Sequence, residues 1–274
     1  MLAEHSLARG WLLTLRWTGI VGALLAWMVL AASILLRMGS RFEADGVLVS
    51  LLPPALEQGT RWVHRITASS CGLLALLCLV AGLKMRHTHH GIRKPIIVIV
   101  AVTLLLAVIG PLTPGYRYAW VTVCNVCGGT VLVAGFWWLQ RVVACGTTTP
   151  MNIWVQWTWV VWLTHIVLGA AASAQIMRGQ YWISFVHSGT AMLAALMLAA
   201  CLRDAWHSRQ SKGLVRAMAA GLILQMTLGT AALWLEVVPI ALGTMHALLS
   251  VFLTIGIVAL SITGGATAPE QAQP

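Results

Sequence analysis

The sequence predicts an all-α integral membrane protein whose eight transmembrane helices form two pseudo-symmetric four-helix bundles. Of the 274 residues, 59% are hydrophobic and only 9% are charged, whereas a soluble domain carries about 25% charged residues. Apolar runs repeatedly reach the roughly 20 residues that cross a bilayer. One hairpin layout also recurs along the chain. These three observations exclude a soluble globular protein.

Eight apolar segments of membrane-spanning length follow one another along the chain. The expected spans are residues 10–37, 61–83, 95–113, 117–140, 153–174, 182–202, 214–235 and 239–263. The first span is too long for the apolar core of a cleavable signal peptide, and no small-residue cleavage site follows it. We therefore expect an N-terminal half, 1–150, and a C-terminal half, 151–274, with four spans each.

Basic residues are distributed unevenly among the predicted loops. One set of loops contains Lys84, Arg86, Arg93, Lys94, Arg203, Arg209, Lys212 and Arg216. The opposite set contains Arg37 and Arg41 in its first loop, and after it only Arg117 and Arg178. The positive-inside rule therefore predicts that both termini are cytoplasmic. We expect the net charge of +10 to mark topology and to contact anionic lipid, not nucleic acid.

Three hairpins share one layout, in which a span ends with a glycine and the next span opens with a polar residue after a short turn. The paired positions are Gly110 and Cys127, Gly169 and His187, and Gly229 and His246, separated by 17, 18 and 17 positions. The first hairpin has the longest outer loop and ends at His64. His64, Cys127, His187 and His246 are therefore expected to be equivalent. A shift of one turn would instead place Cys124 opposite His246.

Three histidines, His64, His187 and His246, occupy the outer ends of even-numbered spans. Polar groups are costly in hydrocarbon and usually serve function there. Imidazoles on facing helices commonly provide the axial ligands of haem iron. We therefore expect His187 and His246 to hold one haem; the alternative is a hydrogen-bonded role in helix packing. His165 lies deeper in its span, and for it packing or hydrogen bonding is favoured over ligation.

Two features near the other equivalent positions leave more than one interpretation. Arg65 follows His64 and suits a haem propionate or another anion, with a lipid headgroup anchor as the alternative. Cys124 and Cys127 share one helix face, yet no histidine follows them as in a c-type haem attachment, and no second cysteine pair completes a zinc site. They are interpreted as packing residues beside Gly128, as a haem-proximal group at Cys127, or as a redox dithiol.

The joint pattern resembles the haem A synthase family over nearly the whole chain. The resemblance is carried by "WVHR" at 62–65, "VHSGTA" at 186–191, "LGTAALWLEVVPIALGTMHALL" at 228–249 and the two halves themselves. That family has eight spans in two four-helix halves and oxidises the C8 methyl of haem O to a formyl group, which makes haem A for terminal oxidases.

The resemblance implies a role for each half. The C-terminal half would carry haem b on His187 and His246, and the N-terminal half would receive haem O near His64. Our hypothesis is that His64 ligates or orients the substrate iron, that Arg65 helps to bind it, and that the face of Cys127 supplies a weaker ligand or an open position. An open iron position suits oxygen chemistry, whereas two strong ligands suit electron transfer.

The chain departs from the family pattern in three places. Cys127 or a neighbour stands where the second N-terminal histidine is expected. No acidic residue stands just ahead of His64, since Glu57 lies seven positions upstream. The first outer loop also lacks the cysteine pair of some members. The first two departures affect the proposed substrate half.

The resemblance also implies a location and partners. We expect a bacterial inner membrane protein with its haem sites towards the outer side. Expected partners are the lipid bilayer, haem O and its synthase, an electron donor of unassigned identity, a downstream haem-copper oxidase and, in a homo-oligomer, further copies of the chain. Two alternatives stay open: a b-type cytochrome that only transfers electrons, and a haem carrier or oxidase assembly factor without catalysis.

Overall fold

The computed structural model describes residues 2–43, 47–85, 90–112, 118–145, 153–176, 182–207, 211–235 and 238–262. Within these ranges the long helices are α1 (Leu2–Met38), α2 (Pro54–Lys84), α3 (Arg93–Ile109), α4 (Ala119–Cys145), α5 (Ile153–Ile176), α6 (Trp182–His207), α7 (Lys212–Trp234) and α8 (Ile240–Ile262). All eight are long and apolar enough to cross a membrane. The predicted fold class, an all-α multi-pass membrane protein, is confirmed.

Like α1, which begins at Leu2 and not at 10, the helix α2 begins well before its predicted span. It begins at Pro54, seven residues before the predicted start at 61. Proline suits the first turn of a helix because its fixed φ is already helical and its missing N–H is not needed there. Glu57 lies in that first turn, where the helix dipole favours an acid, and its carboxylate contacts Arg61 at 2.6 Å. His64 consequently lies about three turns into the helix.

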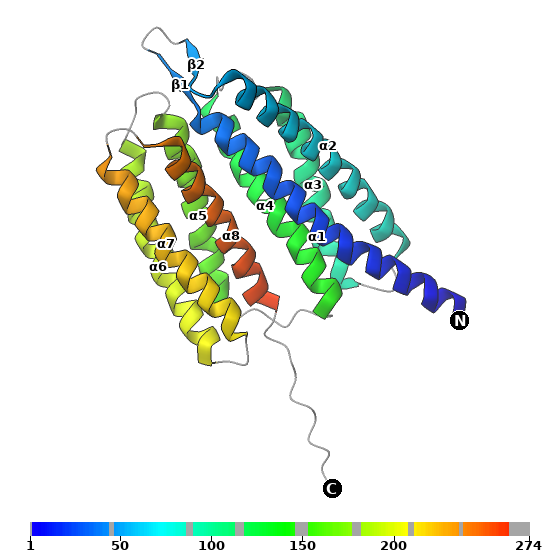
Figure 1. Ribbon diagram of the computed structural model, residues 1–274. Helices are drawn as coiled ribbons and strands as arrows, with labels where there is room; N and C mark the ends of the chain where they lie inside the picture. The colour runs from blue at the N-terminus through cyan, green and yellow to red at the C-terminus, as the bar shows by residue number, and fades with distance from the viewer. Residues whose placement is uncertain are drawn as a thin grey trace.

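Short elements complete the connections. Strands β1 (Ser40–Phe42) and β2 (Leu48–Ser50) pair antiparallel in the connection between α1 and α2, with Ser40 opposite Ser50. The 3₁₀ turns are η1 (His90–Ile92) before α3 and η2 (Gly110–Leu112) after it. The hairpin lies at the end of the bundle opposite to the start of α1 and the end of α8 (Figure 1). Which end faces the cytoplasm stays a prediction.

The eight helices form two groups of four (Figure 1). In one group α1 and α3 each pack on α2 and α4, and in the other α5 and α7 each pack on α6 and α8. The even-numbered helices are therefore the diagonal pairs, α2 with α4 and α6 with α8. The two groups meet where α4 contacts α5 and α8 and where α1 contacts α8. The predicted boundary at 150 lies outside the described residues.

Two buried apolar clusters follow this division. The first includes Leu30, Ile99 and Phe136, contributed by the helices α1, α3 and α4. The second includes Trp162 and Met218, from α5 and α7. Each group thus has a core of its own.

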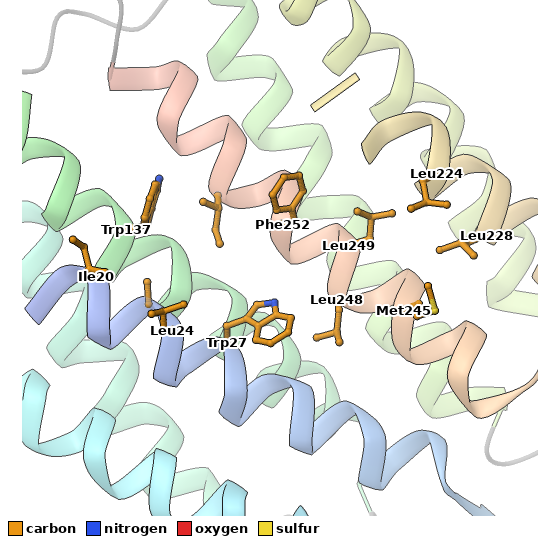
Figure 2. Close-up of a pocket in the computed structure, with 12 residues that line it drawn as sticks. Ile20, Leu24, Trp27, Trp137, Leu224, Leu228, Met245, Leu248, Leu249 and Phe252 are labelled. Carbon is orange, nitrogen blue, oxygen red and sulfur yellow. The ribbon is translucent and has the colours of Figure 1, made fainter. Parts of the chain in front are cut away.

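Between the two groups lies an apolar groove with a volume of about 560 Å³, shown in Figure 2. It is lined by α1, α4, α7 and α8, with Trp27 and Trp137 on one side and Leu224 and Phe252 on the other. Leu224 and Phe252 are exposed. In a bilayer such apolar surface faces lipid chains.

Basic side chains stack on tryptophans at the end of the bundle where α1 begins. The ammonium group of Lys84 lies 5.6 Å from the ring centre of Trp11. The ammonium group of Lys212 and the guanidinium of Arg216 lie 4.7 and 5.5 Å from the ring centre of Trp206. Cations and tryptophan rings of this kind are typical of the interface between membrane and water. The predicted basic residues Arg86, Arg117, Arg178 and Arg209 lie outside the described residues.

Candidate functional site

His187 and His246 face each other across the C-terminal group of helices. Each lies in the second turn of its helix, α6 or α8. Their ring centres are 6.4 Å apart, and the ring planes cross at 87°. Because α6 and α8 are diagonal, the two imidazoles approach from opposite sides of the bundle interior.

A glycine on the neighbouring helix makes room for each of these rings. A Cβ atom at Gly169 of α5 would lie 2.8 Å from Cε1 of His187, and one at Gly229 of α7 would lie 3.0 Å from Cε1 of His246. Two carbon atoms pack best at about 3.5–4.0 Å. The glycine-to-histidine spacing in the sequence thus corresponds to a close contact across each hairpin.

A third histidine belongs to the same cluster. The ring of His165 stacks on that of His187, with ring centres 4.4 Å apart and planes 11° from parallel. His165 is only 4% exposed, and its other neighbour is Trp162, whose ring centre is 5.7 Å away. The structure therefore places His165 as a packed residue against one of the two facing histidines.

Gln225 is a residue that sequence reasoning missed. It is 3% exposed, and its Nε2 atom lies 3.2 Å from Nε2 of His246. An amide N–H donates to an imidazole nitrogen in the tautomer that leaves this nitrogen unprotonated. The signal in the sequence was a glutamine within an apolar span, four positions before Gly229, since polar groups in hydrocarbon usually serve function.

The cluster contains buried polar atoms that lack a partner. Among the residues that the structure describes, Nδ1 of His165, His187 and His246 and Oε1 of Gln225 are buried and accept or donate no hydrogen bond. Each such atom costs about 1–3 kcal/mol. Several of them in one place require an explanation, such as a ligand that completes their coordination.

His64 lies in the other group of helices. It is partly buried, and its Nδ1 atom is 3.2 Å from the backbone carbonyl oxygen of Val29 on α1. When Nδ1–H donates to that carbonyl, Nε2 is left as the atom that can bind a ligand. Arg65 is exposed, with its guanidinium 5.8 Å from the ring centre of Trp62. It therefore lies on the outside of α2.

Cys127 does not share these surroundings. Its partly buried side chain packs against the core cluster of the C-terminal group, which α5 to α8 form. His64 contacts α1, so the two residues predicted to form the substrate site are directed to different parts of the protein. Cys124 and Cys127 are both free thiols.

The second hairpin lacks the contact that the other two make. A Cβ atom at Gly110 would meet no atom of the described residues within 4 Å. On the facing helix, a Cβ atom at Gly128 would lie 2.8 Å from Cδ2 of Leu106. The repeat therefore brings His187 and His246 together with their glycines, but it does not bring Gly110 to Cys127.

Comparisons with known proteins assign no function to this arrangement of residues. No protein-family model matches the chain, and no curated protein sequence does.

Proposed function

We propose that the chain is a membrane haem protein that holds haem b between His187 and His246 and, like the haem A synthases it resembles, oxidises the C8 methyl of haem O to a formyl group. The single observation that carries the haem site is the pair of imidazoles facing each other at 6.4 Å inside an apolar bundle. The proposed reaction, oxidation of haem O, is taken from the resemblance to the haem A synthases.

The residues present fit a haem. Two imidazoles bonded to opposite sides of one metal, with metal–nitrogen bonds of about 2.0–2.1 Å, have ring centres roughly 6–7 Å apart. In the described chain both rings also keep a buried Nδ1 atom without a partner. A haem bound there supplies one-electron chemistry. The surrounding helices exclude water, which is one of the means by which a protein sets a haem potential.

The N-terminal group is the proposed place of the substrate. His64 offers Nε2 while the Val29 carbonyl oxygen holds its Nδ1. Because Cys127 packs towards the other group, one side of the substrate iron would lack a strong protein ligand, as oxygen chemistry requires. Arg65, on the outside of α2, would meet a propionate at the membrane surface. Substrate haem O, an electron donor and a receiving oxidase are the partners that this function needs.

A second function, electron transfer by a b-type cytochrome, is favoured by the same part of the structure. The positions predicted to flank the substrate, His64 and Cys127, have different surroundings. A protein with one haem, on His187 and His246, would then pass electrons without modifying a second haem.

Haem extraction with mass analysis tests the proposal. The chain is produced in cells together with a source of haem O, purified in detergent, and its haems are extracted and weighed. We expect haem b together with hydroxylated or formyl haem. If only haem b is found, and deletion of the gene leaves the haem A of the host unchanged, the proposed oxidation of haem O is wrong and the functions without catalysis take its place.

A matched pair of variants on α6 tests the ligand assignment. His187→Ala should abolish haem b binding. His207→Ala should not, because His207 is exposed in the last turn of the same helix and bonds to the Arg203 carbonyl oxygen of its own helix. Full haem content in His187→Ala, or two haems per chain that both have two histidine ligands, contradicts the proposal.

The proposed location follows the same resemblance. The protein would lie in a bacterial inner membrane with both termini in the cytoplasm. The histidine cluster would then lie towards the outer face, at the end of the bundle that carries β1 and β2. Reaction of single cysteines introduced into the first outer loop with a membrane-impermeant reagent measures this orientation in intact cells.

A further inference from the structure

His165 is a buried histidine that the proposed haem ligation does not use. It lies on α5 among apolar residues, yet its ring stacks on that of His187, with the ring planes 11° from parallel and the ring centres 4.4 Å apart. The torsion that turns an imidazole about its Cβ–Cγ bond has broad minima. Neighbouring contacts, and not the torsion itself, therefore decide the plane of the His187 ring.

Two residues of α5 contact that ring. His165 and Gly169 are four positions apart, so they share one face of the helix. His165 covers a flat side of the His187 ring, and the space above Gly169 receives its Cε1 atom. Rotation of the ring would drive its edge into one of these two neighbours.

His165 is itself held in place. Trp162, one turn earlier on the same helix, is 1% exposed and its ring lies at 49° to that of His165. Its indole Nε1–H donates to Oγ1 of Thr254 on α8 at 2.9 Å. The position of His165 is therefore supported by Trp162, which is hydrogen-bonded to α8, a third helix of the group.

Two residues of α7 contact the ring of His246 in a corresponding way. Gln225 and Gly229 are again four positions apart. The Nε2 atom of Gln225 lies 3.2 Å from Nε2 of the His246 ring, and the missing side chain of Gly229 leaves room for Cε1 of that ring. The two segments read "HIVLG" at 165–169 and "QMTLG" at 225–229. The ring of His187 is thus oriented by α5 and that of His246 by α7, and the two ring planes lie 87° apart.

We propose that His165 is a positioning residue, which fixes the plane of His187 so that the two imidazoles on the iron stay crossed at nearly a right angle. This inference rests on the proposed haem b at His187 and His246. It concerns the orientation of a ligand and not the number of ligands.

Electron paramagnetic resonance reads this orientation directly. A low-spin ferric haem with crossed imidazole planes has a strongly anisotropic signal with an unusually large highest g value, whereas parallel planes give a smaller one. The purified wild-type protein with its haem should show the strongly anisotropic signal. His165→Leu should keep the haem but lower and broaden the highest g value, because the His187 ring is then free to turn.

Two further variants separate stacking from other roles of His165. His165→Phe keeps a flat ring and should retain the wild-type signal. His165→Gln keeps polarity without a ring and should behave like His165→Leu. The control is Thr164→Val, since Thr164 is exposed and its hydroxyl donates to the Val160 carbonyl oxygen of its own helix. The Thr164→Val protein should keep the wild-type resonance signal.

The outcomes distinguish this inference from the proposed function. A wild-type protein without haem b overturns both. If haem b is bound through His187 and His246, three results overturn the inference alone: parallel-plane signals in the wild type, an unchanged signal in His165→Leu, or rescue by Gln and not by Phe.

Discussion

The two groups of four helices share a hairpin layout but differ in what their equivalent residues contact. In the C-terminal group, Gly169 and Gly229 each lie against a histidine ring. In the N-terminal group, no atom of the part of the chain that the structure describes lies within 4 Å of the place where Gly110 lacks a side chain. A shared spacing therefore does not by itself mean a shared site.

The residues four positions before the glycines show the same difference. His165 and Gln225 contact the facing histidines, whereas Leu106 stands four positions before Gly110 and packs on Gly128. Alignment of "WMVLA" at 27–31 with "HIVLG" at 165–169 places Trp27 where His165 stands, and Trp27 lines the apolar groove. The N-terminal group has apolar residues wherever the C-terminal group surrounds its imidazoles with polar ones.

The largest expected effect is a difference in haem b content between histidine variants of the two groups. His187→Ala should remove nearly all haem b, because it deletes one of two ligands. His64→Ala should leave haem b content unchanged, because His64 contacts α1 of the other group. The haem-to-protein ratio of the purified variants, measured by pyridine haemochrome spectra, checks this. Equal loss in both variants would show that the groups do not act separately.

The next largest expected effect is on haem affinity, when the glycine beside a histidine ring is replaced. Gly169→Ala places a carbon against the His187 ring, which must shift, and we expect haem binding to weaken by about 10–100-fold, the usual effect of disturbing a residue behind a metal ligand. Haem transfer to apomyoglobin measures the change.

Gly110→Ala is the matched control for this variant. Its backbone has φ −47° and ψ −47°, which alanine adopts easily, and among the described residues no atom obstructs the new Cβ. It should leave haem binding unchanged. Similar losses in the two alanine variants would mean that helix packing, and not contact with the ring, is responsible.

Gln225→Leu makes the C-terminal group resemble the N-terminal one at this position. It removes the hydrogen bond to His246, and we expect haem binding to weaken by about tenfold, at the lower limit for such supporting residues. Gln225→Glu should recover most of the loss, because the second nitrogen of an iron-bound imidazole carries a proton and the carboxylate accepts a hydrogen bond from it, as Oε1 of Gln225 would with its amide group turned over. Redox titration of both variants provides the second readout, and an unchanged midpoint potential in Gln225→Leu would contradict a contact with the ligand.

The smallest expected effect on haem content comes from restoring the missing histidine. Cys127→His should not create a second site with two histidine ligands, because position 127 packs against the core of the C-terminal group. The larger side chain should instead destabilise the protein by about 1–3 kcal/mol through overpacking. Haem stoichiometry and thermal unfolding in detergent measure both. A second bound haem with a histidine-ligated spectrum would show that position 127 faces the substrate site after all.

The sequence predicted several elements of the fold closely because they depend on local composition. The spans predicted at 153–174 and 239–263 differ from α5 and α8 by no more than two residues at either end. The start of α2 was missed because Glu57 and Arg61 are polar, and hydropathy detects the apolar part of a helix and not its polar first turns. Gln225 was missed because a single amide within an apolar run changes the hydropathy very little.

What the sequence alone determined is the number of spans, their order, and the recurrence of a glycine 17 or 18 positions before a polar residue. Only the tertiary structure decided which of these residues meet. A helix turns by about 100° per residue, so the direction of a side chain depends on how each helix is rotated against its neighbours. That rotation is set by packing, which turns His187 and His246 towards each other and turns Cys127 towards the other half.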